Sequence, residues 1–173
     1  RAVQDWGVEP SRVYATGASN GGMFTMRLAC ERPALFTAYA TAVANLPQAM
    51  TGSCQTQEPV PLLMMNGTAD RLMPWDGGEI PSIKLLGIGA GGYVTSTPAT
   101  LTFWQRVNGC RDDGLQEPVP DRTDDGVTVV KHSWTDCTGR ARLIFYEMKG
   151  GGQNTQDIDA SRVVVDFFKS YGL

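Results

Sequence analysis

Residues 12–30 read RVYATGASNGGMFTMRLAC, and this stretch decides how the rest of the sequence is interpreted. It opens with a short apolar run that is typical of a buried strand and closes with apolar residues at helical spacing before Pro33. Between them lies the turn Gly17-Ala18-Ser19-Asn20-Gly21. In a strand-turn-helix setting, glycines at the first and last positions of such a turn remove side chains that would clash, so the serine hydroxyl is exposed. We therefore predict that Ser19 is a nucleophile; the alternative is an ordinary turn rich in Gly and Ser.

The residues around Ser19 suggest how an attacked carbonyl would be stabilised. The backbone N–H of Asn20 follows the serine directly, where the helix N-terminus adds partial positive charge. We predict that this N–H stabilises an oxyanion.

A nucleophilic serine also needs a base and an acidic residue that orients the base. Asp70 follows the strongest apolar run of the chain, residues 60–65, and its carboxylate could accept a hydrogen bond from an imidazole N–H. We predict that Asp70 is this acid, and the alternative is an Asx-turn residue within GTADRLMP.

The order of elements predicts an α/β fold. Strand-like and helix-like segments alternate, which is typical of a mostly parallel sheet covered on both faces, with active sites at the carboxyl ends of its strands. The expected strands are 11–17, 35–45, 60–65, 126–134 and 140–148, and the expected helices are 21–32, 97–109 and 159–171. The segment from 77 to 92 is expected to be a surface loop.

Composition bounds the number of domains and the class of partner. A chain of 173 residues that is 42% hydrophobic fits one domain, here residues 1–173. The net charge of −3, without a run of Lys or Arg, argues against nucleic acid and anionic membranes as partners. Every apolar stretch is shorter than the roughly 18 residues that a membrane-spanning helix needs. The sequence specifies no oligomeric state.

The four cysteines favour two disulfides and an oxidising compartment. Cys30, Cys54, Cys110 and Cys137 lack the spacing of a zinc site, so we expect no metal. Of three possible pairings we favour Cys30–Cys54 and Cys110–Cys137, because each would tie an element to the loop or hairpin that follows it. Four buried thiols are the alternative.

Several segments together resemble the secreted polyhydroxybutyrate depolymerase and feruloyl esterase family of α/β-hydrolases. They are DWGVEPSRVYATGASNGGMFTMRLACERPALFTAYATAVA, PVPLLMMNGTADRLMPWDGG, FWQRVNGC, DC and YEMKGGG followed by DIDASRVVVDFF. The resemblance implies an α/β-hydrolase fold with Ser19 as nucleophile, Asp70 as acid and a Cys110–Cys137 disulfide. It also implies a secreted enzyme, without a cofactor, that hydrolyses polyhydroxyalkanoate polyesters or the feruloyl and acetyl esters of plant polysaccharides.

The sequence departs from the family where the catalytic histidine is expected. In the family this histidine directly follows the glycine run after the last strand, whereas here Gly152 is followed by Gln153. Three explanations are open: residues absent from this sequence between Gly152 and Gln153, a true deletion that leaves an inactive protein, or replacement by His132. His132 is the single histidine of the chain, and its segment VTVVKHSW is typical of a strand interior.

The family's N-terminal strands are missing as well. The nucleophile strand is central in a sheet of this kind, so we expect the domain to be incomplete at its N-terminus and at the loop after Gly152. A strand left without a neighbour is prone to aggregation.

Aromatic residues are candidates for contact with the substrate. Trp75 is the best of them because it follows Asp70 closely, whereas Trp104, Trp134 and Tyr93 are weaker candidates and core packing is the alternative for all four. The sequence therefore predicts a serine esterase, and the competing hypothesis is an esterase-like binding protein without catalysis.

Overall fold

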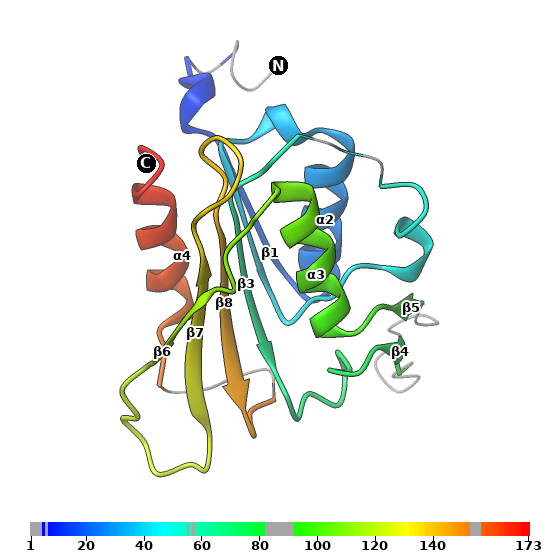
Figure 1. Cartoon of the computed structure of the whole chain (residues 1–173), viewed down its shortest axis with the longest axis vertical. Helices are drawn as coiled ribbons and strands as arrows, with labels where there is room; N and C mark the ends of the chain where they lie inside the picture. The colour runs from blue at the N-terminus through cyan, green and yellow to red at the C-terminus, as the bar shows by residue number, and fades with distance from the viewer. Residues whose placement is uncertain (1–4, 6, 55, 57, 82–91, 153–156) are drawn as a thin grey trace.

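A six-stranded sheet in the order β1-β2-β3-β8-β7-β6 forms the centre of the fold (Figure 1). The structure is a computed structural model that describes all residues except 1–4, 6, 55, 57, 82–91 and 153–156. The strands of the sheet are β1 (Tyr14–Ala18), β2 (Ala38–Ala42), β3 (Leu62–Gly67), β6 (Leu115–Pro118), β7 (Thr128–Trp134) and β8 (Leu143–Lys149). The helices are α2 (Asn20–Glu31), α3 (Thr97–Asn108) and α4 (Ala160–Lys169), with single 3₁₀ turns at Pro10–Arg12, Pro33–Leu35 and Gln48–Met50.

Four neighbouring strands run parallel and set the functional edge of the sheet. β1, β2, β3 and β8 pair in parallel, whereas β7 pairs antiparallel with both β8 and β6. The carboxyl ends of the parallel strands therefore meet at one edge, and β3 and β8 end side by side there in Figure 1. We call this the carboxyl edge: the segments that directly follow β1, β2, β3 and β8.

Both faces of the sheet are covered, as the apolar runs predict. α2 and α3 lie over one face and α4 over the other (Figure 1). Alternate residues of β3 accordingly join two cores: Leu62 and Met64 pack with Trp104 under α3, and Leu63 packs with Phe167 of α4.

Capping residues mark the boundaries of α3 and α4. The side chain of Ser96 accepts a hydrogen bond from Ala99 N–H (3.1 Å) at the start of α3, and Gly109 ends that helix with a φ of 59°. The side chain of Asp159 accepts one from Arg162 N–H (3.0 Å) at the start of α4.

Two disulfides join the predicted cysteine pairs, Cys30 to Cys54 and Cys110 to Cys137. The first ties the end of α2 to the segment before β3, and the second ties the end of α3 to the turn between β7 and β8.

The sequence did not predict three short strands. β6 was missed because LQEP is exposed and contains a proline, so it shows no buried pattern. β4 (Gly78–Glu79) lies within the segment 77–92 that was expected to be loop, and it pairs antiparallel with β5 (Tyr93–Val94), which directly follows that segment. Residues 82–91 of the expected loop lie outside the described residues.

Candidate active site

Ser19 lies at the carboxyl edge, in the turn between β1 and α2. Its φ is 52°, and Ser19 and Val43 (φ 47°) are the two non-glycine residues with positive φ in the described part of the chain. Its N–H donates to the carbonyl of Ala42 at the end of β2 (2.9 Å), and its carbonyl accepts from Met23 N–H (3.0 Å). The residue is exposed. The sharp turn that the sequence predicts is therefore present, with the serine on the outside of the fold.

The glycines of the turn allow the helix to start directly against the strand. A Cβ atom on Gly17 would run into the backbone carbonyl of Gly21, so any larger residue would push α2 away from β1. Gly21 itself has open space around a Cβ position. The first glycine is thus required by close approach and the second is not.

Asn20 is the first residue of α2, and the helix N-terminus there is open. The Ser19 side chain makes no capping hydrogen bond, so it leaves the first backbone N–H groups of the helix to another acceptor. Such an end attracts negative charge. The position suits the oxyanion role predicted for the Asn20 N–H.

Asp70 lies in the loop after β3, with its side chain buried at 8% exposure. Its Oδ1 accepts from the N–H groups of Leu72 (2.7 Å) and Met73 (2.9 Å), so the Asx-type turn that was the alternative interpretation does form. Its Oδ2 is buried and has no hydrogen-bond partner among the described residues. A buried carboxylate oxygen without a donor costs free energy. Besides its turn hydrogen bonds, Asp70 therefore presents an acceptor that no described group uses.

The segment after β8 lies directly beside the Asp70 loop. Ala69 N–H donates to the carbonyl of Gly151 (2.8 Å), and Gly150 N–H donates to the Thr68 hydroxyl (2.9 Å). A Cβ atom on Gly67 would collide with the carbonyls of Gly151 and Gly152. The described chain therefore reaches Gly152 beside the loop that carries Asp70. Positions 153–156, where the sequence departs from the family, lie outside the described residues.

Ser19 and Asp70 share the carboxyl edge with one strand between their own. The spacing of neighbouring strands places the ends of β1 and β3 roughly 10 Å apart. One imidazole ring with a hydrogen bond at each nitrogen spans most of such a gap.

His132 is not the base for Ser19. It lies within β7, which is four strands from β1, so the two residues are separated by about 19 Å across the sheet. Its Nε2 is 2.9 Å from the Glu147 carboxylate, and its ring stacks on Trp134. The explanation in which His132 replaces the missing base is therefore wrong. His132 lies inside a strand, as its segment predicts, and is hydrogen-bonded there.

The aromatic candidates divide between edge and core. Trp75 is half-buried, with its ring 6.1 Å from that of Phe145, and its carbonyl accepts from Thr97 N–H (2.8 Å). Trp104 and Trp134 are 0% and 8% exposed, so they are core residues and not groove residues. Tyr93 is exposed on the small β4–β5 pair.

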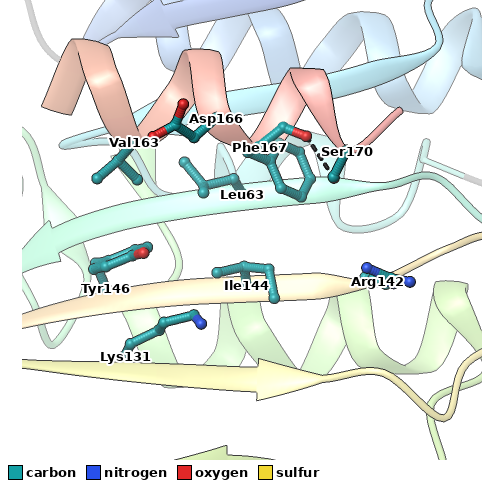
Figure 2. Close-up of a pocket in the computed structure, with 9 residues that line it drawn as sticks. All are labelled: Leu63, Lys131, Arg142, Ile144, Tyr146, Val163, Asp166, Phe167 and Ser170. Carbon is teal, nitrogen blue, oxygen red and sulfur yellow. Dashed lines mark hydrogen bonds between the residues drawn. The ribbon is translucent and has the colours of Figure 1, made fainter. Parts of the chain in front are cut away.

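A groove of about 270 Å³ opens elsewhere, between α4 and the strands that it covers (Figure 2). Its lining includes neither Ser19 nor Asp70 nor Trp75. Its charges are largely paired, since Lys131 contacts Glu117 (3.3 Å). The groove is not the candidate active site.

No metal centre is found in the part of the chain that the structure describes, because no three His, Cys, Asp or Glu side chains gather there. Sequence reasoning also missed Asn66, Asn45 and Thr97, which form a buried polar network beneath the edge. The available signal was an asparagine that ends the apolar run LLMMNG.

Comparison with known proteins finds esterases, although no protein-family model matches the chain. The predicted esterase NocK of Nocardia uniformis subsp. tsuyamanensis is 29% identical over 84% of this chain and 42% of its own length. Feruloyl esterase B of Piromyces equi is 25% identical over 96% of this chain and 28% of its own length. Acetylxylan esterase of Coprinopsis cinerea is 43% identical over 32% of this chain and 17% of its own length. The chain thus spans less than half the length of each of these relatives.

A solved structure shows the same fold. Acetyl xylan esterase from Aspergillus awamori superposes with a TM-score of 0.61 over 97% of this chain and 63% of that chain, at 18% identity. This chain therefore has an α/β-hydrolase-like fold, and its sequence is similar to those of proteins named esterases.

Proposed function

We propose that this chain hydrolyses carboxylic esters through an acyl-enzyme formed on Ser19. The observation that carries this proposal is the Asp70 carboxylate. One oxygen is fixed by two backbone N–H groups and the other is buried without a partner among the described residues, at the same sheet edge as a serine on a strained turn. An imidazole between them would accept the serine proton on one nitrogen and donate to Asp70 from the other.

The reaction then follows from the geometry. Ser19 Oγ attacks the ester carbonyl carbon while its proton passes to the imidazole, and the Asn20 N–H stabilises the oxyanion. The alcohol leaves with the imidazolium proton, and the acyl group stays on Ser19. Water then attacks the acyl carbonyl carbon while its proton passes to the imidazole. Ser19 Oγ leaves with the imidazolium proton, and the carboxylic acid is released.

The base is the part of this mechanism that the given sequence lacks. Gly152 is followed by Gln153, and an amide does not accept a proton near neutral pH. We propose that the active form carries a histidine between these two residues, directly after a segment whose Gly150 and Gly151 are hydrogen-bonded to the Asp70 loop.

The substrate class is proposed from the relatives. Proteins named feruloyl esterase and acetylxylan esterase favour feruloyl or acetyl esters of plant polysaccharide over a polyhydroxyalkanoate polyester. Trp75, half-buried near the edge, is the candidate for contact with an aromatic or sugar ring. Two disulfides support a secreted protein.

Two measurements on the purified protein test the proposal. Its intact mass is compared with the 18.7 kDa of this sequence, and we expect a heavier chain. Hydrolysis of p-nitrophenyl acetate and butyrate is then measured for the parent, Ser19→Ala and Asp70→Asn. We expect Ser19→Ala to abolish turnover and Asp70→Asn to lower kcat by about 10⁴-fold, because the imidazole would take the wrong tautomer. Equal rates for the parent and Ser19→Ala would refute the enzyme.

A non-catalytic binding protein is the second candidate. It is favoured by one observation, namely that the single histidine of the sequence lies in β7 and is bonded to Glu147. When a triad lacks its base, removing the serine as well costs little more. A mass of 18.7 kDa together with turnover that Ser19→Ala does not change would therefore select this candidate.

A further inference from the structure

We propose that Asn66 is a positioning residue that fixes the Ser19 turn and the Asp70 loop relative to each other. This role rests on the proposed function, since it concerns the same site. Asn66 does not touch a substrate: it is 3% exposed, at the end of β3 beneath the carboxyl edge.

The amide of Asn66 is fully used within the protein. Its Oδ1 accepts from the N–H of Ala44 (3.0 Å), and its Nδ2 donates to the carbonyl of the same residue (3.1 Å). Nδ2 also lies within hydrogen-bond distance of Asn45 Oδ1 (2.8 Å) and Thr97 Oγ1 (3.1 Å). One side chain therefore joins the segment after β2 to the start of α3.

On one side this network reaches Ser19. Ala44 follows Val43, a β-branched residue with φ 47° that is strained in this conformation, and the preceding Ala42 carbonyl accepts the Ser19 N–H. A Cβ atom on Gly22 would collide with the Ala44 side chain, so the first turn of α2 rests on Ala44. Asn66 hydrogen-bonds to both the N–H and the carbonyl of Ala44. It therefore keeps the segment 42–44, which contacts the Ser19 turn, in its strained conformation.

On the other side the network reaches the loop that carries Asp70 and Trp75. Thr97 Oγ1 donates to Asn45 Oδ1 (2.9 Å), and Asn45 Nδ2 donates to the carbonyl of Pro74 (3.0 Å). Thr97 N–H donates to the Trp75 carbonyl (2.8 Å). The end of this loop is therefore fixed by the two residues that Asn66 contacts.

Asn108 offers a matched control elsewhere in the same protein. Its Oδ1 accepts from Val60 N–H and its Nδ2 donates to the Val60 carbonyl, both at 2.9 Å, and it is 0% exposed. This is the same bridge to one backbone residue, but it lies before β3 begins, at the opposite end of that strand from Asn66. Loss of either amide should cost similar stability, whereas only loss of Asn66 should loosen the site.

The test is native-state hydrogen exchange, read by mass spectrometry, of the parent, Asn66→Ala and Asn108→Ala. For Asn66→Ala we expect exchange at least about tenfold faster in residues 17–23 and 69–75, and for Asn108→Ala no change there. Equal loosening of both segments in the two variants, or none in Asn66→Ala, would overturn the role. If Asn66→Ala does not fold, Thr97→Val is measured instead. We expect faster exchange in residues 69–75 of this variant, and unchanged exchange there would overturn the role.

Ester turnover provides the second readout. We expect Asn66→Ala to lower kcat at least tenfold with KM changed less than threefold, and Asn108→Ala to change both less than threefold. If the parent shows no turnover that depends on Ser19, the proposed function fails, and the exchange data alone then decide the role of Asn66.

Discussion

The backbone conformation at position 19 costs free energy for any residue other than glycine. A φ of 52° with a ψ of −119° is a conformation that L-residues avoid, and the exposed side chain gains no packing there. We expect Ser19→Gly to be more stable than Ser19→Ala by about 1 kcal/mol, although both lack the hydroxyl. Urea unfolding of the two variants measures the difference. Equal stability, or a more stable alanine variant, would show that the turn is not strained.

Tyr39 makes stability depend on pH in the alkaline range. Burial raises the pKa of its phenol to about 12, and its hydroxyl donates to the Arg32 carbonyl (2.9 Å). In the unfolded chain this phenol ionises near pH 10. Between about pH 10 and pH 12 the folded state therefore binds more protons than the unfolded state, so the free energy of unfolding falls as the pH rises. We expect Tyr39→Phe to be less stable than the parent at pH 8, and the gap to narrow at pH 11. Urea midpoints at both values measure it, and a constant gap would contradict the assignment.

Candidate residues for the site could be named from the sequence only where a local pattern marks them. Ser19 was marked by its turn, and Asp70 by its place after the most apolar run. Asn66 was not, because its partners Ala44, Asn45 and Thr97 are 21 to 31 residues away and meet only in the folded sheet. Likewise, the strain at Val43 follows from tertiary contacts that its sequence neighbours do not reveal.

At the scale of elements, Gly17 and Gly21 of the Ser19 turn contribute differently to stability. Gly17→Ala should lower the free energy of unfolding by about 2 kcal/mol or more, since its Cβ would meet the Gly21 carbonyl and separate α2 from β1. Gly21→Ala is the control, because it lies in the helix with open space around it and should gain about 0.5–1 kcal/mol of helix propensity. Chemical denaturation compares them. Similar losses in both variants would refute the close-contact explanation.

The well-predicted elements are those whose periodicity and caps agree. α3 and α4 begin at the capping residues Ser96 and Asp159, and β3 is buried along its whole length. β6 escaped prediction because an exposed edge strand such as LQEP is defined by its partner β7 and not by its own pattern.

For the whole molecule, the unpaired edge of β1 is the main site where self-association is expected. Among the described residues β1 pairs with β2 alone, and beside it lies an apolar groove of about 400 Å³ whose lining includes Thr16, Ala18 and Val165. We expect a chain of these 173 residues to self-associate, and Val165→Lys to weaken that association at least tenfold, because a charge would be buried in the contact. Light scattering after size exclusion over a range of concentrations measures it. A parent that stays monomeric at high concentration would show that the edge is protected.

That Ser19 and Asp70 lie at one edge of the sheet was predictable at this scale, because parallel strands impose it. Ser19 and Asp70 follow two strands of one parallel set, so they share an edge whatever the loops do. No base for Ser19 could be predicted, because the histidine that the family pattern contains after Gly152 is absent from this sequence.

The most direct test of whether Ser19 and Asp70 act together is to introduce a histidine at the carboxyl edge. In a chain of this sequence, Gln153→His places an imidazole directly after Gly152, whose neighbour Gly151 is bonded to the Asp70 loop. The measurement is kcat/KM for p-nitrophenyl butyrate in the parent, in Gln153→His, and in that variant combined with Ser19→Ala or Asp70→Asn. We predict a gain of about 10²-fold or more that either second substitution removes. No gain, or a gain that survives Ser19→Ala, would contradict the claim that Ser19 and Asp70 form one catalytic site.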